Sequence, residues 1–481
     1  MRFEIAAAMT LLLACASIAP CMAEDTSVGS QDSSARAGSQ ATTDATNSPG
    51  PSASPSAFAF AGGVALGSDV ILSGDNGTAQ TWTKLSFQPD LSFGKIGLGL
   101  DLPIHFMLYQ TTDQAVTIYG GDWIPNYENN GKSFFDVYLP KIMYVRYGKK
   151  GEDPFFAKFG SISDLSLGDG FIMSNYSNML FLPAQRIFGL DLGLDGTLFQ
   201  FPYVGIEAIA GNLARLDVMG ARVYGRPLID TSIPILKDLQ VGATFVGDTN
   251  PYLYENTGSA SPVGAYGADI LVPIIGGSLF PLSTFTDLAF DPNESAGWMI
   301  GAGGRIIGIF TYGAQLRVLQ DGFVPSYFDA NYDLYRAERY DYMQLAHGTN
   351  FTPSWYASLG TSLLSDKLVF NVALDGPFAA PAVVANLATA SQTDYPHLRG
   401  VLSLAQIDTI PVYFDASYDK YYIGAIKGFF PDLVDPTDAV IGMDINYKTG
   451  AAVLTLAYNA EWNPVASKFE VTSSLQAAVK F

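Results

Sequence analysis

The chain has 481 residues and a formal net charge of −20, with 15% charged and 48% hydrophobic residues. Soluble domains carry about 25% charged residues, so part of this surface is expected to face something other than water. The acidic balance, with no basic patch, excludes nucleic acid as a partner. Both cysteines, Cys15 and Cys21, lie near the N-terminus, so no disulfide is expected in the chain that follows them.

Residues 1–23 are predicted to be a secretory signal peptide. Arg2 precedes an apolar stretch from Ile5 to Pro20, and Cys21-Met22-Ala23 supplies small residues for cleavage. Leu12-Leu13-Ala14-Cys15 is also similar to a lipoprotein box, in which Cys15 would be lipidated. Cleavage after Ala23 and lipidation of Cys15 both remain open at this point.

Residues 24–57 are predicted to form a disordered periplasmic tether. The segment consists mostly of Ser, Ala, Thr, Gly, Asp and Pro. Such a composition cannot bury enough apolar surface to form a core. We expect a spacer here rather than a binding element.

From Phe58 to the end, the sequence returns repeatedly to a period of two. Residues 96–109, 190–195, 298–306 and 312–318 place apolar side chains on one parity and mostly Gly or polar side chains on the other. No 3.6-residue period is sustained, and no apolar run is long enough for a spanning helix. Residues 58–481 are therefore predicted to be one all-β domain.

The connections between these segments differ in length. Gly94-Lys95, Ser365-Asp366-Lys367 and Lys448-Thr449-Gly450 read as tight hairpin turns. On the other side of the sheet the connections are long and rich in Asn, Gly, Asp and Tyr. The long connections are residues 110–133, 161–185, 247–262, 321–352, 376–396 and 420–438.

The last residues, Phe469 to Phe481, alternate again and end on a Phe. This segment resembles the C-terminal strand of bacterial outer-membrane β-barrel proteins, whose terminal Phe is read by the barrel-insertion machinery. The resemblance implies a single transmembrane antiparallel up-and-down β-barrel of about 14 to 20 strands. A soluble β-sandwich or propeller is the alternative, but its wet faces would carry many more Lys, Glu and Arg residues.

What the class implies is location in the outer membrane of a Gram-negative-type bacterium, with short turns in the periplasm and long loops outside. Its expected partners are outer-membrane lipid, the insertion machinery and small solutes. The expected function is a porin-like channel for diffusion of small cationic or neutral solutes. A long-chain fatty-acid type transporter, and an adhesin or receptor barrel, are the alternatives. Homo-oligomerisation is left open.

An enzyme is not expected. The three histidines, His105, His347 and His397, form no metal-ligand spacing, and the sequence contains no nucleophile elbow or phosphate loop. No cofactor, metal or catalytic residue is predicted.

The parity of each segment predicts which ionisable residues face the lumen. Charges of both signs would create a field across a pore, with acids in excess, although each charge could equally serve as a cross-strand pair in the wall. The predicted lumen charges are Asp101, Asp191, Asp195, Glu207, Arg222, Arg226, Asp269, Arg305, Arg317, Arg399, Asp415, Asp419 and Asp444.

Residues 160–186 are more apolar than an exposed loop should be, because they include Leu165, Leu167, Phe171 and Met173. We expect this loop to fold inward against the wall and to constrict the channel. Asp164, Asp169 and Arg186 would then lie at the constriction. A loop that only caps the rim, or two further short strands, are the alternatives.

A second loop carries Tyr327, Tyr332, Tyr335, Tyr340 and Tyr342, together with Arg336, Glu338, Arg339 and Asp341. These residues are typical either of a surface that binds a host or phage protein or of an aromatic girdle with a solvated rim.

Overall fold

The structure is a computed structural model that describes most of residues 59–480. The predicted signal peptide, the tether, Cys15 and the terminal Phe481 lie outside the described residues. No helix within the described ranges is long and apolar enough to cross a membrane. The gaps are residues 74–77, 109–115, 130, 181–185, 255–257, 277–278, 365–366, 380–382, 384–391, 408, 451 and 464–467.

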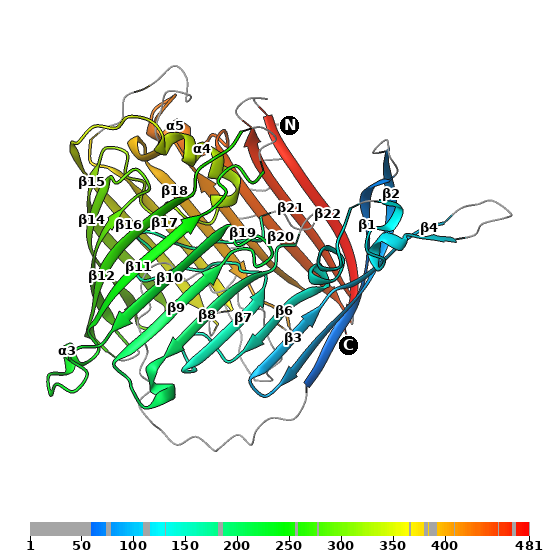
Figure 1. The fold of residues 1–481 in the computed structure, drawn as a ribbon, viewed down its shortest axis with the longest axis horizontal. Helices are drawn as coiled ribbons and strands as arrows, with labels where there is room; N and C mark the ends of the chain where they lie inside the picture. Colours follow the sequence, from blue (N-terminus) through cyan, green and yellow to red (C-terminus); the bar gives the residue numbers. More distant parts are fainter. Residues whose placement is uncertain are drawn as a thin grey trace. The chain divides into compact units, whose positions relative to one another are not determined.

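All 22 strands of the described chain belong to one antiparallel sheet (Figure 1). Most strands pair with the strand that follows them, and β1 pairs with β22 over Gly63–Leu66, which closes the sheet. The predicted all-β, up-and-down barrel is confirmed. The strands are β1 (Ala59–Ser73), β2 (Thr78–Phe93), β3 (Ile96–Leu100), β4 (Leu102–Leu108), β5 (Val116–Ile118), β6 (Ile142–Tyr147), β7 (Phe155–Gly160), β8 (Gly189–Asp195), β9 (Val204–Ala210), β10 (Val218–Gly225), β11 (Gln240–Asp248), β12 (Val263–Ile275), β13 (Leu282–Phe290), β14 (Ala296–Ile306), β15 (Phe310–Gln320), β16 (Phe351–Leu363), β17 (Leu368–Pro377), β18 (His397–Leu404), β19 (Val412–Lys420), β20 (Ala439–Thr449), β21 (Ala452–Asn463) and β22 (Lys468–Lys480).

The closed circuit omits β4 and β5. Both β3 and β4 pair with β2, but β3 continues the circuit to β6, whereas within the described ranges β4 pairs onward with β5 alone. Leaving β4 and β5 out of the 22 strands gives a circuit of 20. This even number is the upper end of the predicted range.

The sequence predicts one continuous strand over residues 96–109, and the structure breaks it at Asp101. The Asp101 carboxylate accepts hydrogen bonds from Ser86 and from Gln88 (3.2 Å), and its backbone N–H donates to the Lys141 carbonyl (2.7 Å). The β3–β6 register also shifts between Gly99 and Leu100. The ladder therefore changes partner at Asp101, which alternation alone could not reveal.

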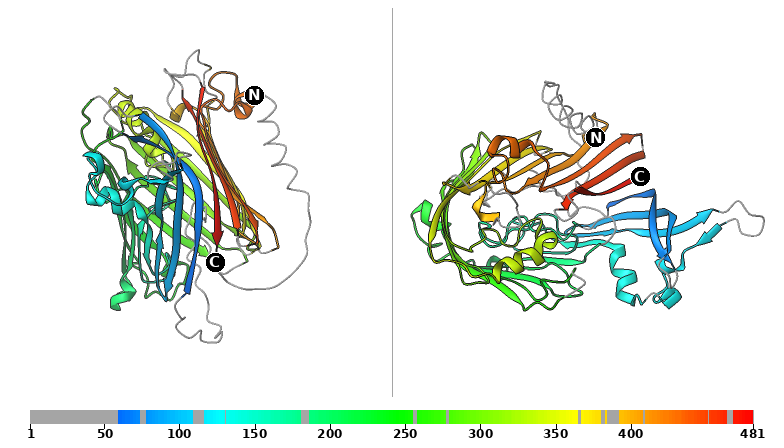
Figure 2. Two further views of the ribbon diagram at one scale, coloured as in Figure 1. Left: turned by 90° about the vertical axis from the view of Figure 1, so that its right-hand side faces the viewer. Right: turned by 90° about the horizontal axis from the view of Figure 1, so that it is seen from above.

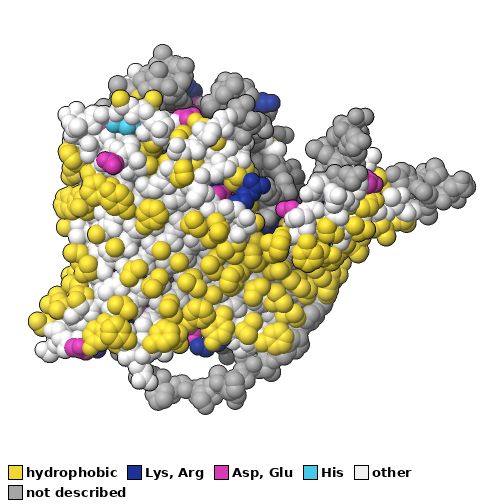
Figure 3. Space-filling model, in the orientation of Figure 1, with side chains coloured by type: hydrophobic (Ala, Val, Ile, Leu, Met, Phe, Trp, Pro, Cys, Tyr) yellow, Lys and Arg dark blue, Asp and Glu magenta, His cyan; other side chains and the backbone are white. Residues whose placement is uncertain are grey.

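Alternation places apolar side chains outside and polar or small ones inside. On β11, Val241 and Phe245 are exposed on the outer face, whereas Thr244, Val246 and Asp248 are buried on the inner face. Figure 3 shows apolar side chains over the outer face of the nearer strands, with few charges among them. A closed sheet with such a face satisfies its backbone internally and suits hydrocarbon surroundings.

Two long connections lie inside the strands rather than above them. Residues 161–180 and 321–350 together form what we call the inner plug, and their apolar side chains share one buried cluster with the inner wall of β9 to β15. Figure 2, seen from above, shows α4 within the ring of strands. The helices are α2 (Phe134–Tyr138), α3 (Pro234–Lys237), α4 (Tyr332–Met343) and α5 (Phe429–Val434), with 3₁₀ turns η2 (Gly120–Asp122), η3 (Tyr127–Asn129), η4 (Leu139–Lys141), η5 (Gly196–Phe199) and η7 (Gln392–Asp394).

Candidate functional site

The first part of the inner plug, residues 161–180, folds back on itself and packs against the wall. Leu165 and Tyr176 exchange backbone hydrogen bonds of 2.9 and 2.8 Å. Leu167 is 3% exposed and Met173 is fully buried. The predicted inward packing of this apolar loop is therefore present in the structure.

The second part of the plug is joined to the first by its backbone. The N–H of Ser174 donates to the Phe328 carbonyl (3.1 Å), and the N–H of Phe328 donates to the Ile172 carbonyl (3.1 Å). The Ser326 N–H also donates to the Phe171 carbonyl (2.8 Å). These bonds satisfy buried polar groups of both loops, so the two loops act as one packed unit.

Helix α4 fastens the plug to the wall through a buried arginine. Arg336 donates two hydrogen bonds of 2.7 Å to the Asp248 carboxylate at the end of β11, and one of 3.0 Å to Asp217. The Tyr332 hydroxyl donates to the same Asp248 carboxylate (2.7 Å). Such charge-assisted, bidentate contacts fix geometry as well as contributing energy.

Acids exceed bases around Arg336. Asp333 lies 3.4 Å from its guanidinium, so three carboxylates, those of Asp217, Asp248 and Asp333, surround one positive charge. Burial raises the pKa of Asp333 to about 7. The Asp217 Oδ1 atom accepts no hydrogen bond among the described residues.

A cavity of about 130 Å³ lies between the plug and the wall strands β15 to β18. The plug contributes Asp329 and Arg339, and each of the four wall strands contributes a charged or a hydroxyl-bearing side chain. The lining is Ser174, Asn175, Arg317, Leu319, Val324, Pro325, Ser326, Asp329, Arg339, Ser354, Tyr356, Ala373, Asp375, Gly376, Thr393, Tyr395, His397, Arg399 and Tyr421.

The charged side chains of this cavity are organised in pairs. Arg317 donates to Asp375 (2.9 Å), and Arg339 donates to Asp329 (2.5 Å). The His397 ring lies between Asp375 and Asp419 and stacks on Tyr421, with 4.4 Å between the ring centres. The cavity thus offers a polar surface without a large net charge of either sign.

Many predicted lumen charges do face inward, and the structure pairs several of them. Arg222 bonds Asp269 (2.5 Å) and lies 3.6 Å from Glu207, and Arg226 bonds Asp195 (2.6 Å). Two more pairs are Arg399 with Asp419 (2.8 Å) and Lys150 with Asp191 (3.0 Å). For these residues the structure favours a role in holding the wall.

Other predicted lumen charges are more open to water. Asp415 and Asp444 are exposed and directly opposite each other on β19 and β20, where Asp415 accepts a hydrogen bond from Ser403. Arg305 is half-buried near the end of β14.

The three residues predicted to form one constriction lie in different places. Asp169 is buried near Arg222 and Asp269, whereas Arg186 pairs with Asp101 (3.2 Å). Asp164 accepts a hydrogen bond from the Ser163 hydroxyl (3.0 Å), and burial raises its pKa to about 6. A single eyelet built from these three side chains is therefore not what the structure contains.

Most side chains of the Tyr-rich loop are buried or half-buried inside the barrel. Tyr327 and Tyr332 are fully buried, and Arg336 and Arg339 are 2% and 4% exposed. Glu338 and Asp341 of the same loop are exposed, so they remain available to the predicted host or phage partner. Such a partner at other long loops stays a prediction.

Sequence reasoning missed Asp217, Asp248, Asp287 and Asp375, which the structure places at the plug or the cavity. Asp287 and Asp375 do lie on the inward parity of β13 and β17, so their alternation was the available signal. Asp248 lies on the inward parity of β11 as well, whereas Asp217 precedes the first residue of β10, where parity gives no information.

No protein-family model matches the sequence, and no curated protein matches it. Solved structures with a similar fold include OpdL of Pseudomonas aeruginosa, at 10% identity over 88% of this chain and 97% of that chain, with a TM-score of 0.31. OccK8 (OprE) of the same organism is 9% identical over 88% and 97%, with a TM-score of 0.32. CdiB from Acinetobacter baumannii is 8% identical, with a TM-score of 0.25, and this chain spans 60% of its length.

Likenesses this weak say nothing about substrate or activity. The class of this protein follows from its own structure instead. A closed antiparallel sheet with an apolar outer face is the architecture of an outer-membrane β-barrel.

Proposed function

We propose that this protein is an outer-membrane channel for small polar solutes, neutral or cationic, whose passage runs beside the inner plug. The observation that carries this proposal is the 130 Å³ cavity between the plug and β15 to β18. Its arginines are matched by carboxylates, so a neutral solute would meet hydrogen-bonding groups without net repulsion.

Preference for cations is supported by the acidic surplus of the chain, which has 46 Asp and Glu against 26 Lys and Arg. A surplus of one sign in a narrow aqueous space raises the local concentration of the opposite ion. The long loops would be extracellular and the short turns periplasmic, as the alternation of connection lengths indicates.

The test is planar-bilayer conductance of refolded residues 24–481 in a KCl gradient. Stable unitary steps with a reversal potential toward the potassium equilibrium value would support the proposal. A folded, heat-modifiable barrel without conductance would overturn it.

A transporter of hydrophobic substrates is the second candidate, and one observation favours it. Among the described residues, β6 pairs with β3 but not with β4, so the wall ladder is interrupted beside Asp101. The plug is also largely apolar. Uptake of a fluorescent long-chain fatty acid by vesicles that show no ion conductance would favour this candidate over the channel.

A further inference from the structure

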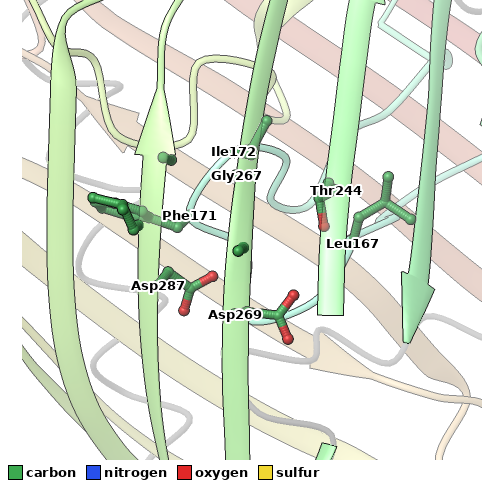
Figure 4. Close-up of a pocket in the computed structure, with 10 residues that line it drawn as sticks. Leu167, Phe171, Ile172, Thr244, Gly267, Asp269 and Asp287 are labelled. Carbon is green, nitrogen blue, oxygen red and sulfur yellow. The ribbon is translucent and has the colours of Figure 1, made fainter. Parts of the chain in front are cut away.

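The first part of the inner plug, the loop of residues 161–180, contacts the wall at a cluster of carboxylates. Asp169 of the loop is buried near Glu207 of β9, Arg222 of β10 and Asp269 of β12. Asp287 of β13 stands directly opposite Asp269 in the β12–β13 register. Figure 4 shows Asp269 and Asp287 side by side on their two strands, at a cavity of about 10 Å³ beside Phe171 and Leu167 of the loop.

One guanidinium serves four carboxylates in this cluster. Arg222 donates to both oxygens of Asp269 (3.0 and 2.5 Å) and lies 3.6 Å from Glu207. These contacts pair its charge with the wall, so in the described part of the chain no ion pair joins Asp169 or Asp287 to a cation. Like charges directly opposite each other on neighbouring strands destabilise a sheet.

Two oxygen atoms of the cluster have no hydrogen-bond partner among the described residues. They are the Oδ2 atoms of Asp169 and Asp287, whose side chains are 8% and 9% exposed. An ionised carboxylate that is buried and unpaired is very costly, and such groups take up a proton instead. The cavity has room for about one water molecule, so bulk solvent does not neutralise them.

We propose that the loop of residues 161–180 binds one proton at Asp169 when it docks on the wall, so that docking weakens as the pH rises. A neutral Asp169 adds no charge to the cluster, whereas an ionised Asp169 faces the carboxylates of Asp269 and Glu207, which already share Arg222. The proton is the ligand of this contact, and the loop is the element that responds to it.

The direction of the pH dependence follows from linkage. Burial, with the charges of Asp269 and Glu207, raises the pKa of Asp169 to about 7 in the docked loop, while the ordinary value is 3.8. A released Asp169 is ionised above its ordinary pKa, so docking takes up a proton between about pH 4 and pH 7. Within that window docking weakens about tenfold per pH unit, and above it docking changes no further.

Docking can be followed by thiol accessibility, because residues 24–481 contain no cysteine. Leu167 is 3% exposed, so the thiol of Leu167→Cys reacts with a methanethiosulfonate reagent only when the loop leaves the wall. Ser232→Cys, at an exposed turn before α3, corrects for the pH dependence of thiol chemistry. The measured quantity is the ratio of the two labelling rates from pH 4 to pH 9.

The background for this experiment is Asp164→Asn, because burial also favours a proton on Asp164 in the same loop. In that background we expect the ratio to rise about tenfold per pH unit between pH 4 and 7 and then level. Adding Asp169→Asn, which imitates the neutral acid, should keep the ratio low at every pH, and Asp169→Glu should restore the rise. An equal rise with and without Asp169→Asn would overturn the proposal.

A second variant covers the case in which Asp169→Asn does not fold, as judged by heat-modifiability. Glu207→Gln removes a neighbouring charge that raises the pKa of Asp169, so the upper end of the window should move to lower pH, and an unmoved window would overturn the proposal. Docking does not depend on the proposed channel function. Conductance that fails to follow the labelling would remove the loop from the pore and leave the proton-linked contact intact.

Discussion

The two flanks of the inner plug differ in chemistry. Toward β9 to β14 the contact is dry, since Val246, Ala265 and Met299 of the wall are fully buried under the plug. Toward β15 to β18 the contact is polar and encloses the 130 Å³ cavity. Under the proposed function, the dry flank would hold the plug in place and the polar flank would line the passage.

The largest expected effect on conductance comes from removing the loop of residues 165–180 on the dry flank. Replacing residues 165–180 by a short Gly-Ser linker takes away much of the apolar cluster and opens the dry flank to water. Single-channel conductance should rise several-fold, because the first part of the plug no longer occupies the lumen. Unchanged conductance in planar bilayers would contradict a constricting role for this loop.

Arg336→Ala should release α4 from the dry flank. The substitution leaves the buried carboxylates of Asp217 and Asp248 without their cation, which costs about 3 to 5 kcal/mol. Limited proteolysis at increasing temperature should cleave α4 at a lower temperature in Arg336→Ala than in the wild-type protein. Arg336→Lys keeps the charge but not the bidentate contact, so its cleavage temperature should lie between those of Arg336→Ala and the wild-type protein. Cleavage of both variants at the wild-type temperature would contradict the anchoring role of Arg336.

Substitutions of two methionines, one in the plug and one on the outer wall, allow a direct comparison of the two regions. Met173 is fully buried in the plug, whereas Met219 on β10 is 37% exposed. Met173→Ala should weaken plug docking by about 2 to 5 kcal/mol through the cavity that it leaves. Met219→Ala should leave plug proteolysis unchanged, and a reversed order would show that the plug core contributes little.

The smallest expected effect concerns the polar flank. Arg399→Gln removes one positive charge from the cavity lining while the plug contacts of the dry flank stay as they are. One unit charge at 4 Å in water amounts to about 1 kcal/mol, so the potassium-to-chloride permeability ratio should rise by up to about fivefold. A reversal potential equal to that of the wild-type protein would indicate that ions do not pass along this cavity.

Part of this architecture could be predicted from the sequence, because a strand repeats every two residues and every barrel strand obeys the same rule. The inward loop could also be predicted, since its Leu and Phe residues are too apolar for water. Helix α4 could not. Its six buried positions include three charged residues, so hydrophobic periodicity does not show the helix. The positions are Tyr332, Asp333, Arg336, Arg339, Tyr340 and Met343.

The sequence alone predicts that the chain is all-β, that its strands have an apolar and a polar face, and that some neighbouring strands are joined by short connections. Those properties depend on neighbours along the chain, so local alternation encodes them. Two features could be read only from the folded chain: two loops pack together inside the lumen, and Asp101 divides a strand. The fold also places Asp169 near Asp269 and Asp287. These carboxylates come from segments far apart in the sequence, so no local pattern connects them.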